Sequence, residues 1–356
     1  MFDCHKHLKA FHDDCVTLSD DMKQKMRARR DANQKRLARG LENAEGPKAL
    51  RHVKQGSYAM HTMVQSEFDA SDIDDGVIFA KADLVGPKGA EYSPLDAKTM
   101  VKNALDDGSF KTPPEIHTNC VRVFYNDGFR LDIPVYREVE GFFGTYYELA
   151  SSNWKKSDPE GVTTWFNGRV IEKSPDTNNG RQMRRIVRLL KAWCKSRKSW
   201  NMPSGFILSK LTDEVYVKDM TLLDRDDKAL LQVMEAILKR LKGVFFPNLV
   251  VEHPVLFGEN ITKTSNDPDM VELRDRLEGA VKTLSVLRQS DCTELDSLKA
   301  LREIFNTDYF DDQIAELEDE SKKSGSASNS QSTSATLTGL TPVAAVVKKG
   351  GEGRYA

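Results

Sequence analysis

Two aspartates separated by one residue open an apolar run of the chain, in the sequence DIDDGVIF at residues 72–79. Side chains of a β-strand alternate between its two faces, so in a strand here Asp72 and Asp74 lie on one face, about 6 to 7 Å apart along the backbone. Two carboxylates in a partly buried site cannot both stay charged without a cation. Hard oxygen ligands at this spacing suit Mg²⁺, so the pair predicts a divalent-metal site.

A Gly-Ser pair upstream carries groups suited to binding a phosphate. Gly56-Ser57 precedes YAMHTMVQ, a segment that can form a helix. The N-terminus of a helix offers free N–H groups and the positive end of the helix dipole, and both favour a phosphate. A phosphate site followed by paired aspartates is the layout that nucleotidyl transfer requires.

A third carboxylate follows at Asp132. The sequence Asn-Asp-Gly at 126–128 joins two strand-like runs, residues 121–125 and 128–136, and predicts a hairpin between them. This hairpin would place Asp132 beside the strand of the aspartate pair. We expect Asp75 to face outward, because it falls on the opposite face of that strand. The competing interpretation of these neighbouring acids is a solvated turn.

Together these segments resemble the polymerase-beta-like nucleotidyltransferases. A wider match, through DIDDG, LDIPVY, SDPEGVTTWFN and LLKAW, resembles the bacterial cGAS/DncV-like nucleotidyltransferases (CD-NTases), which make cyclic oligonucleotide signals in anti-phage (CBASS) defence. The resemblance spans about residues 20–315. It departs from the family pattern in two places: Gln55 replaces the usual apolar residue before Gly-Ser, and fourteen residues separate Ser57 from Asp72, slightly more than usual.

The resemblance implies a role for each candidate residue. Three carboxylates would be catalytic and would hold two Mg²⁺ ions, which Mn²⁺ can replace: Asp72, Asp74 and Asp132. Four residues would bind the nucleotide, at the donor triphosphate: Gly56, Ser57, Lys191 and Ser204. The expected substrate is ATP, with GTP as an optional second nucleotide. The product would be a cyclic di- or trinucleotide, with an adenine-containing trinucleotide favoured.

Two stretches are strongly basic. Residues 23–39 hold eight basic residues and one acid, and predict either the solvated face of a long helix or a surface for nucleic acid or an acidic partner. Residues 181–198 hold eight basic residues and no acid, with an apolar stripe at helical spacing. Their basic row is interpreted either as a solvated face or as the neighbour of a triphosphate: Arg184, Arg188, Lys191 and Lys195.

The pattern of elements predicts an α+β protein with a mixed β-sheet, flanking helices and a helical C-terminal half. We expect residues 1–175 to form the nucleotidyltransferase core, including a long helix from Ser19 to about residue 45. Ser93-Pro94 predicts the start of a second helix, of about a dozen residues, that ends at Gly108. Residues 176–315 would form a helical domain that closes the active-site cleft. Residues 316–356 would be a disordered tail, because eleven of the twenty-one residues from 321 to 341 are Ser or Thr.

The tail ends in a Gly-rich stretch and Ala356. An unstructured extension explains this composition. The resemblance suggests a second interpretation, because some relatives are encoded with ubiquitin-transfer-like enzymes that activate a small terminal residue. In that case Ala356 would be a conjugation site and such an enzyme a partner.

Composition excludes several classes. No run approaches the ~20 apolar residues of a membrane span and no signal peptide opens the chain, so we expect a cytoplasmic protein without a membrane. Basic and acidic residues nearly balance, 52 against 54. Near the N-terminus five residues could hold zinc, but their spacing fits no common zinc site and a helical or frayed N-terminus is favoured: Cys4, His5, His7, His12 and Cys15.

Two further functions stay open. One is a related nucleotidyltransferase that makes linear oligoadenylate or extends RNA. The other is an idle nucleotidyltransferase fold that binds nucleic acid or protein through its basic helices. The three aspartates argue against the idle fold, and a cyclic oligonucleotide synthase would not require nucleic acid.

Overall fold

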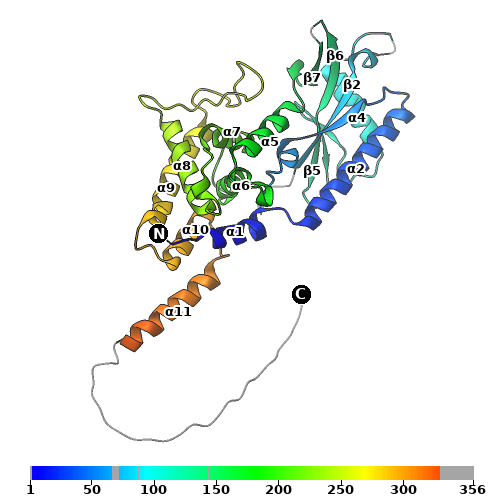
Figure 1. Ribbon diagram of the computed structural model, residues 1–356. Coiled ribbons are helices and arrows are strands. Elements are labelled where there is room, and N and C mark those ends of the chain that lie inside the picture. The colour runs from blue at the N-terminus through cyan, green and yellow to red at the C-terminus, as the bar shows by residue number, and fades with distance from the viewer. Residues whose placement is uncertain (1, 66–71, 87, 143, 329–356) are drawn as a thin grey trace, which may run out of the picture. The chain divides into compact units, whose positions relative to one another are not determined.

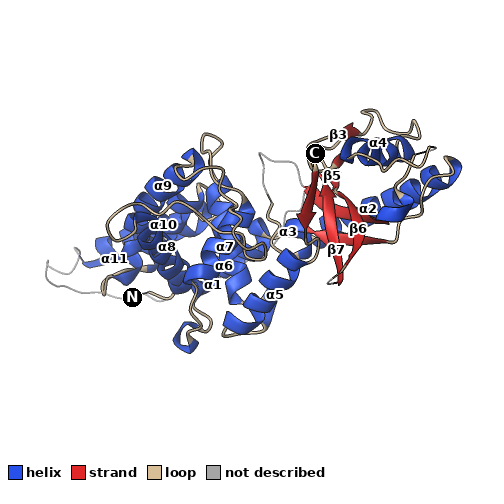
Figure 2. Ribbon diagram, turned by 90° about the horizontal axis from the view of Figure 1, so that it is seen from above, coloured by secondary structure: helices blue, strands red, loops and turns tan. Residues whose placement is uncertain are grey.

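The computed structural model describes residues 2–65, 72–86, 88–142 and 144–328 (Figure 1). One compact unit extends to Ile314, and a second unit begins at Ala315. The first unit holds a mixed β-sheet and a group of helices, so the predicted α+β architecture is confirmed (Figure 2).

The sheet has eight strands, in the order β3-β4-β5-β2-β6-β7-β8, with β1 paired to β2. Strand β2 runs parallel to β5 and β6, and every other pairing is antiparallel. The strands are β1 (Arg51–Gln55), β2 (Asp72–Ala80), β3 (Glu115–Ile116), β4 (Val121–Phe124), β5 (Arg130–Ile133), β6 (Val135–Gly141), β7 (Gly144–Ala150) and β8 (Trp154–Ser157).

The strand order brings the predicted hairpin beside β2. Asp74 pairs with Asp132, and Val77 pairs with Val135, so β5 and β6 follow one another along β2 in a single register. The interruption falls at Pro134, which has no N–H to give to a strand ladder. Its carbonyl still accepts a hydrogen bond from Val77 N at 2.9 Å.

Helices cover one face of this sheet. The long helix α2 (Asp20–Asn43) and α4 (Pro94–Leu105) lie on the side away from the helical half (Figure 2). Their apolar side chains share one core with the β2 residues that point the same way, among them Ile73 and Phe79. Both helices start where the sequence predicted. The hydroxyl of Ser19 accepts from Met22 N, and Ser93 forms a capping box.

Asp75 corrects one expectation. It lies on the opposite face of β2 from the aspartate pair, as predicted, but only 2% of it is exposed. Its carboxylate accepts a hydrogen bond from Gln34 Nε2 at 2.8 Å and lies 3.3 Å from His52 Nδ1. The expectation that it faces outward is wrong because α2 covers this face of the sheet.

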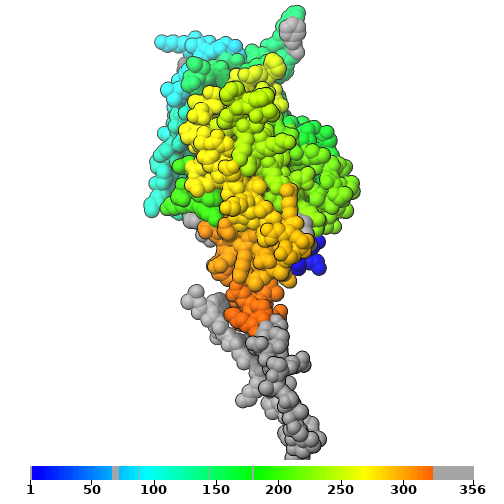
Figure 3. All heavy atoms as spheres, turned by 90° about the vertical axis from the view of Figure 1, so that its left-hand side faces the viewer, coloured from blue at the N-terminus to red at the C-terminus, as the bar shows by residue number. Residues whose placement is uncertain are grey.

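The rest of the first unit is helical, and Figure 3 views its outer side, where α8, α9 and α10 appear in yellow-green to orange. The helices after the sheet are α5 (Gly161–Lys173), α6 (Gln182–Lys195), α7 (Gly205–Val215), α8 (Asp226–Lys242), α9 (Pro268–Leu284) and α10 (Glu294–Phe305). Short 3-10 turns join them: η3 (Asn178–Gly180), η4 (Met220–Leu222) and η5 (Ser285–Arg288); η2 (Lys81–Asp83) follows β2.

The N-terminal segment belongs with these helices and not with the sheet where we had placed it. Helix α1 (His5–Phe11) and the π-helical turn η1 (His12–Val16) contact α8 and α6. The Phe11 ring packs 4.7 Å from that of Phe305. The N-terminus is therefore helical, as favoured. Four of the five residues considered for zinc bond to separate partners: Cys4 Sγ, for example, donates to Asp227, and His5 Nδ1 accepts from Asp226 N.

The second unit includes most of helix α11 (Asp311–Ser328). This helix continues past residue 316, the predicted start of the disordered tail. The remainder of that tail, including Ala356 and the proposed conjugation site, lies outside the described residues. None of the helices in the described part of the chain is both long and apolar enough to cross a bilayer.

Candidate active site

The three predicted carboxylates lie on neighbouring strands at one end of the sheet. Asp74 of β2 stands directly beside Asp132 of β5, and Asp72 stands beside Arg130. Alternation along each strand puts all of these side chains on the face that α2 and α4 leave uncovered. The predicted hairpin thus brings Asp132 next to the pair.

Electrostatics at this position favour a cation. Burial raises the pKa of Asp74 to about 7, helped by the negative charges of Asp132 and Asp72. The pKa of Asp72 is raised by burial and then by Asp132. Oδ1 of Asp72 is buried and has no hydrogen-bond partner in the described part of the chain. An unpaired buried oxygen beside two further carboxylates is the donor set that a hard divalent ion takes.

Asp132 is not free to join such a site in this structure. Arg122 of β4 donates from Nε to Oδ1 at 2.6 Å and from Nη2 to Oδ2 at 2.7 Å. Among the described residues, no three His, Cys, Asp or Glu side chains are arranged to hold one metal ion. The residue types therefore fit a metal site, and in this structure both oxygens of the Asp132 carboxylate are bonded to Arg122.

The Gly-Ser turn approaches the pair more closely than any side chain would allow. Gly56 begins the short helix α3 (Gly56–Ala59) with a φ of +61°. A Cβ at Gly56 would lie 2.0 Å from Oδ2 of Asp74. Glycine is required here both for the left-handed backbone and for the contact with the carboxylate.

The helix predicted over YAMHTMVQ is wrong beyond Ala59. His61 has a φ of +54°, which ends the helix. The carbonyls that a longer helix would use are taken by basic side chains of α6. These bonds are Arg184 Nε to Met60 O at 3.0 Å, Arg188 Nε to His61 O at 2.9 Å, and Lys191 Nζ to Thr62 O at 3.1 Å.

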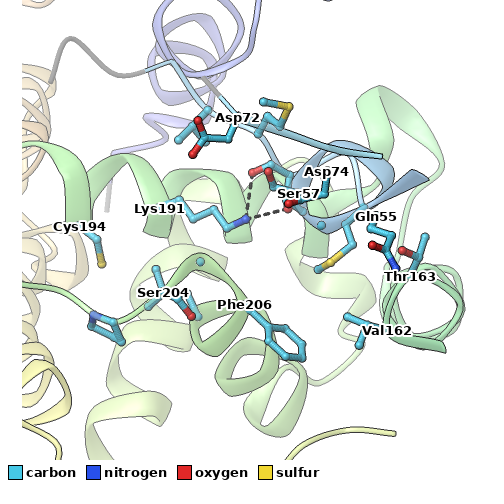
Figure 4. Close-up of a pocket in the computed structure, with 18 of the residues that line it drawn as sticks. Gln55, Ser57, Asp72, Asp74, Val162, Thr163, Lys191, Cys194, Ser204 and Phe206 are labelled. Carbon is cyan, nitrogen blue, oxygen red and sulfur yellow. Dashed lines mark hydrogen bonds between the residues drawn. The ribbon is translucent and has the colours of Figure 1, made fainter. Parts of the chain in front are cut away.

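This arrangement overturns the solvated interpretation for three members of the α6 row. Arg184, Arg188 and Lys191 hold the 60–62 loop, and Lys191 also donates to Thr62 Oγ1 at 2.7 Å (dashed lines in Figure 4). Burial, helped by the positive charges of Lys195 and Arg188, lowers the pKa of Lys191 to about 7. Lys191 is thus a buried amine within a row of cations, which favours the approach of an anion.

A cavity of about 830 Å³ opens at this point (Figure 4). Six of the seven predicted catalytic and binding residues line it: Gly56, Ser57, Asp72, Asp74, Lys191 and Ser204. Asp132, the seventh, lies beside Asp74 and outside the lining. Ser204 caps α7 by accepting from Ile207 N at 3.4 Å. The next residue, Gly205, lies so close to Lys191 that a Cβ there would be 3.0 Å from Lys191 Nζ.

Other lining residues were missed from the sequence. Phe206 and His253 form one wall, with ring centroids 5.5 Å apart. Gln55, noted only as a departure from the family pattern, donates from Nε2 to the Tyr136 hydroxyl at 3.0 Å and to Pro159 O at 2.7 Å. A polar residue before the Gly-Ser turn therefore links β1, the sheet and the start of α5. Single aromatic and amide residues give no spacing signal by which sequence reasoning could find them.

Comparison with known proteins agrees with this geometry. Residues 50–136 match the family described as "Cyclic GMP-AMP synthase DncV-like, nucleotidyltransferase domain". Over these residues the chain is similar to DncV-like nucleotidyltransferase domains. The matched region covers β1, α3, β2 and β5, the elements that carry the Gly-Ser turn and the three aspartates, so the resemblance stated from the sequence is confirmed for the domain.

Solved structures extend the likeness beyond the DncV-like domain. Vibrio cholerae DncV cyclic AMP-GMP synthase, bound to the linear intermediate 5′ pppA(3′,5′)pG, has 17% identity and a TM-score of 0.69, over 86% of this chain and 96% of that one. Bradyrhizobium diazoefficiens CD-NTase CdnG in complex with GTP has 15% identity and a TM-score of 0.67, over 89% and 98%. E. coli MS115-1 CdnC with ATP has 16% identity and a TM-score of 0.64, over 86% and 99%. The shared fold thus includes the helical half.

Proposed function

We propose that this protein condenses nucleoside triphosphates, ATP among them, into a cyclic oligonucleotide. One observation carries the proposal: a single cavity is lined by the Asp72–Asp74 pair, the Gly56-Ser57 turn and Lys191, with Asp132 on the adjacent strand. DncV is a cyclic AMP-GMP synthase, and its structure holds a linear intermediate. The likeness to DncV therefore supports a cyclic product over a linear one.

Each residue of the cavity has a place in the reaction. Asp72 and Asp74 would hold two Mg²⁺ ions, which Mn²⁺ can replace, with Asp132 completing the set on the acceptor side. Bound ions supply Lewis acidity to the reacting phosphate and lower the pKa of the attacking hydroxyl. Backbone N–H groups at Gly56 and Ser57 hold the donor phosphates. Lys191 and Ser204 complete this binding site for the donor triphosphate.

The chemistry is an in-line displacement. The 3′-hydroxyl oxygen of the acceptor forms a bond to the donor α-phosphorus, the bond to pyrophosphate breaks, and the hydroxyl proton is lost. For a cyclic dinucleotide, a second displacement on the resulting linear intermediate closes the ring, and for a cyclic trinucleotide one further coupling precedes the closure. Because positioning and charge stabilisation supply most of the rate in such sites, the closely packed turn and carboxylates matter more than any single base.

We place the product in antiviral signalling, on the resemblance to the anti-phage CD-NTases, and the protein in the cytoplasm. An adenine-containing trinucleotide is the product that we favour. Base choice would be set by the wall that includes Phe206 and His253.

The test uses the purified full chain, Mg²⁺ and the four labelled nucleoside triphosphates. We expect a product that resists phosphatase and has the mass of a cyclic di- or trinucleotide. Asp74→Asn should lower the rate of product formation by about a hundredfold or more, because one carboxylate of the pair is lost. A product that phosphatase shortens would identify a linear synthase instead. No turnover with any nucleotide would leave only a binding role for the fold.

A further inference from the structure

Arg122 occupies a particular position in the sheet. It pairs across β4 and β5 with Asp132, which pairs across β5 and β2 with Asp74, so the three side chains form one lateral row. The guanidinium bonds both oxygens of Asp132. Both partners are largely buried, with side chains 21% and 13% exposed. A two-pronged bond between buried groups is the strongest form of arginine–carboxylate pairing.

The other two carboxylates have no such partner. Within the part of the chain that the structure describes, no ion pair reaches Asp72 or Asp74, and Oδ1 of Asp72 is buried without a hydrogen bond. The structure thus divides the trio into two groups. Asp72 and Asp74 line the cavity ready for a cation, whereas Asp132 already has one.

We propose that Arg122 is an internal countercation that withholds Asp132 from divalent metal until the nucleotide is bound. Arg122 acts through Asp132 and is therefore a positioning residue. In the free protein only Asp72 and Asp74 would be available to hold a metal ion, and binding would be weak. With nucleotide bound, the phosphates add negative charge and the Asp132 carboxylate turns from Arg122 to complete the site. This inference rests on the metal-dependent function proposed above.

The choice of arginine matters for this role. Its planar fork matches both oxygens of a carboxylate, whereas a lysine presents a single point charge. A lysine here would keep the charge but could not hold both oxygens of Asp132. The two effects of Arg122, its charge and its grip on Asp132, can therefore be separated by substitution.

The experiment measures Mn²⁺ binding to the full chain without nucleotide, from the loss of the free-ion signal in electron paramagnetic resonance. Arg122→Met should tighten Mn²⁺ binding by about tenfold or more, because a nearby positive charge is lost and a third ligand is released. Arg122→Lys should give a smaller gain. It also serves as the working variant if Arg122→Met does not fold, and no gain from it would then contradict the proposal.

Two controls separate the effect of the hydrogen bonds between Arg122 and Asp132 from the effect of the positive charge of Arg122. Arg130→Met removes the same charge from β5, where Arg130 stands beside Asp72. It should tighten Mn²⁺ binding less than Arg122→Met. In an Asp132→Asn background, Arg122→Met should lose most of its gain. Equal gains in the two backgrounds, or equal gains from the two arginines, would overturn the proposal. Because no nucleotide is present, this result is distinct from a failure to form product.

Discussion

At the scale of single residues, the geometry of the site depends on Gly56, which has no side chain. Gly56 lets the backbone of the Gly-Ser turn lie against the carboxylate of Asp74, where a Cβ would come within 2.0 Å of Oδ2. The Oδ2 atom that such a Cβ would meet belongs to Asp74, whose side chain would itself be catalytic. A substitution at Gly56 therefore displaces two parts of the site together, the turn and the carboxylate.

Gly56→Ala should lower kcat by about a hundredfold or more, since a misplacement of about 1 Å in such sites costs that much. The change in the free energy of unfolding should stay near 1–2 kcal/mol, the usual cost of a left-handed alanine. Initial rates and urea unfolding measure the two effects. Gly168→Ala is the matched control, because a Cβ at Gly168 in α5 meets nothing within 4 Å. Full activity in Gly56→Ala would show that the turn does not set the geometry.

At the scale of elements, α6 is fastened to the loop that follows the Gly-Ser turn. Three basic side chains of this helix bond three consecutive carbonyls, so the helical half directly shapes a wall of the candidate site. Lys191 is the last of the three and the only one that lines the cavity. Burial keeps its pKa near 7, far below that of a free lysine.

This position predicts that nucleotide binding is coupled to proton uptake. At pH 8 to 9, Lys191 of the free protein is mostly neutral, because its pKa is about 7. A triphosphate beside it favours the charged form and raises the pKa, so the complex takes up close to one proton. Calorimetry with a nonhydrolysable ATP analogue, in two buffers of different ionisation enthalpy, measures this number. Below about pH 6 the uptake should vanish, because Lys191 is already charged.

Lys191→Met should abolish the uptake at pH 8 to 9, and Lys195→Met, one turn further along α6, should retain it. Uptake that persists in Lys191→Met would assign the proton elsewhere. The same shift has a consequence for stability. The unfolded chain holds this proton up to about pH 10.5 and the folded chain only to about pH 7. Folding without nucleotide should therefore become more favourable as the pH rises between these values.

Elements with local signals could be predicted, and elements that depend on distant partners could not. β2, the hairpin of β4 and β5, and the capped start of α4 follow from alternation, Asn-Asp-Gly and Ser-Pro. By contrast β1 is a short polar strand, RHVKQ, whose sequence gives no strand pattern. The helix end at His61 and the burial of Asp75 depend on α6 and α2, which lie far away in sequence.

The same division holds for the site. The three aspartates, the Gly-Ser turn and Lys191 could be found from motifs, because each is tied to a fixed spacing or to a family segment. The pairing of Asp132 with Arg122 could not, since it depends on the register of β4 against β5. A motif identifies which side chains are present, but only the packing decides which of them are already bonded to one another.

At the scale of the whole molecule, the N-terminal segment packs against helices from the C-terminal half of the sequence. Residues 5–16 lie against the helical half, so the long helix α2 starts from one part of the unit and crosses the sheet of the other. Phe11 is the centre of this contact, 5% exposed and packed on the rings of Phe305 and Phe310. The N-terminal segment should therefore stabilise the helical half, and the sheet should depend on it less.

Phe11→Ala should lower the free energy of unfolding by about 3–5 kcal/mol, the usual cost of removing a buried aromatic ring. Hydrogen exchange should rise first in α10 and α1, because the ring contacts lie there, and later in β2. Phe2→Ala is the matched control, since Phe2 stacks on His7 with ring centroids 6.3 Å apart, and its loss should cost far less. If exchange in β2 rises together with that in α10, the two halves unfold as one cooperative unit. In that case the N-terminal segment supports the three aspartates of the candidate site as well as the helices on which it lies.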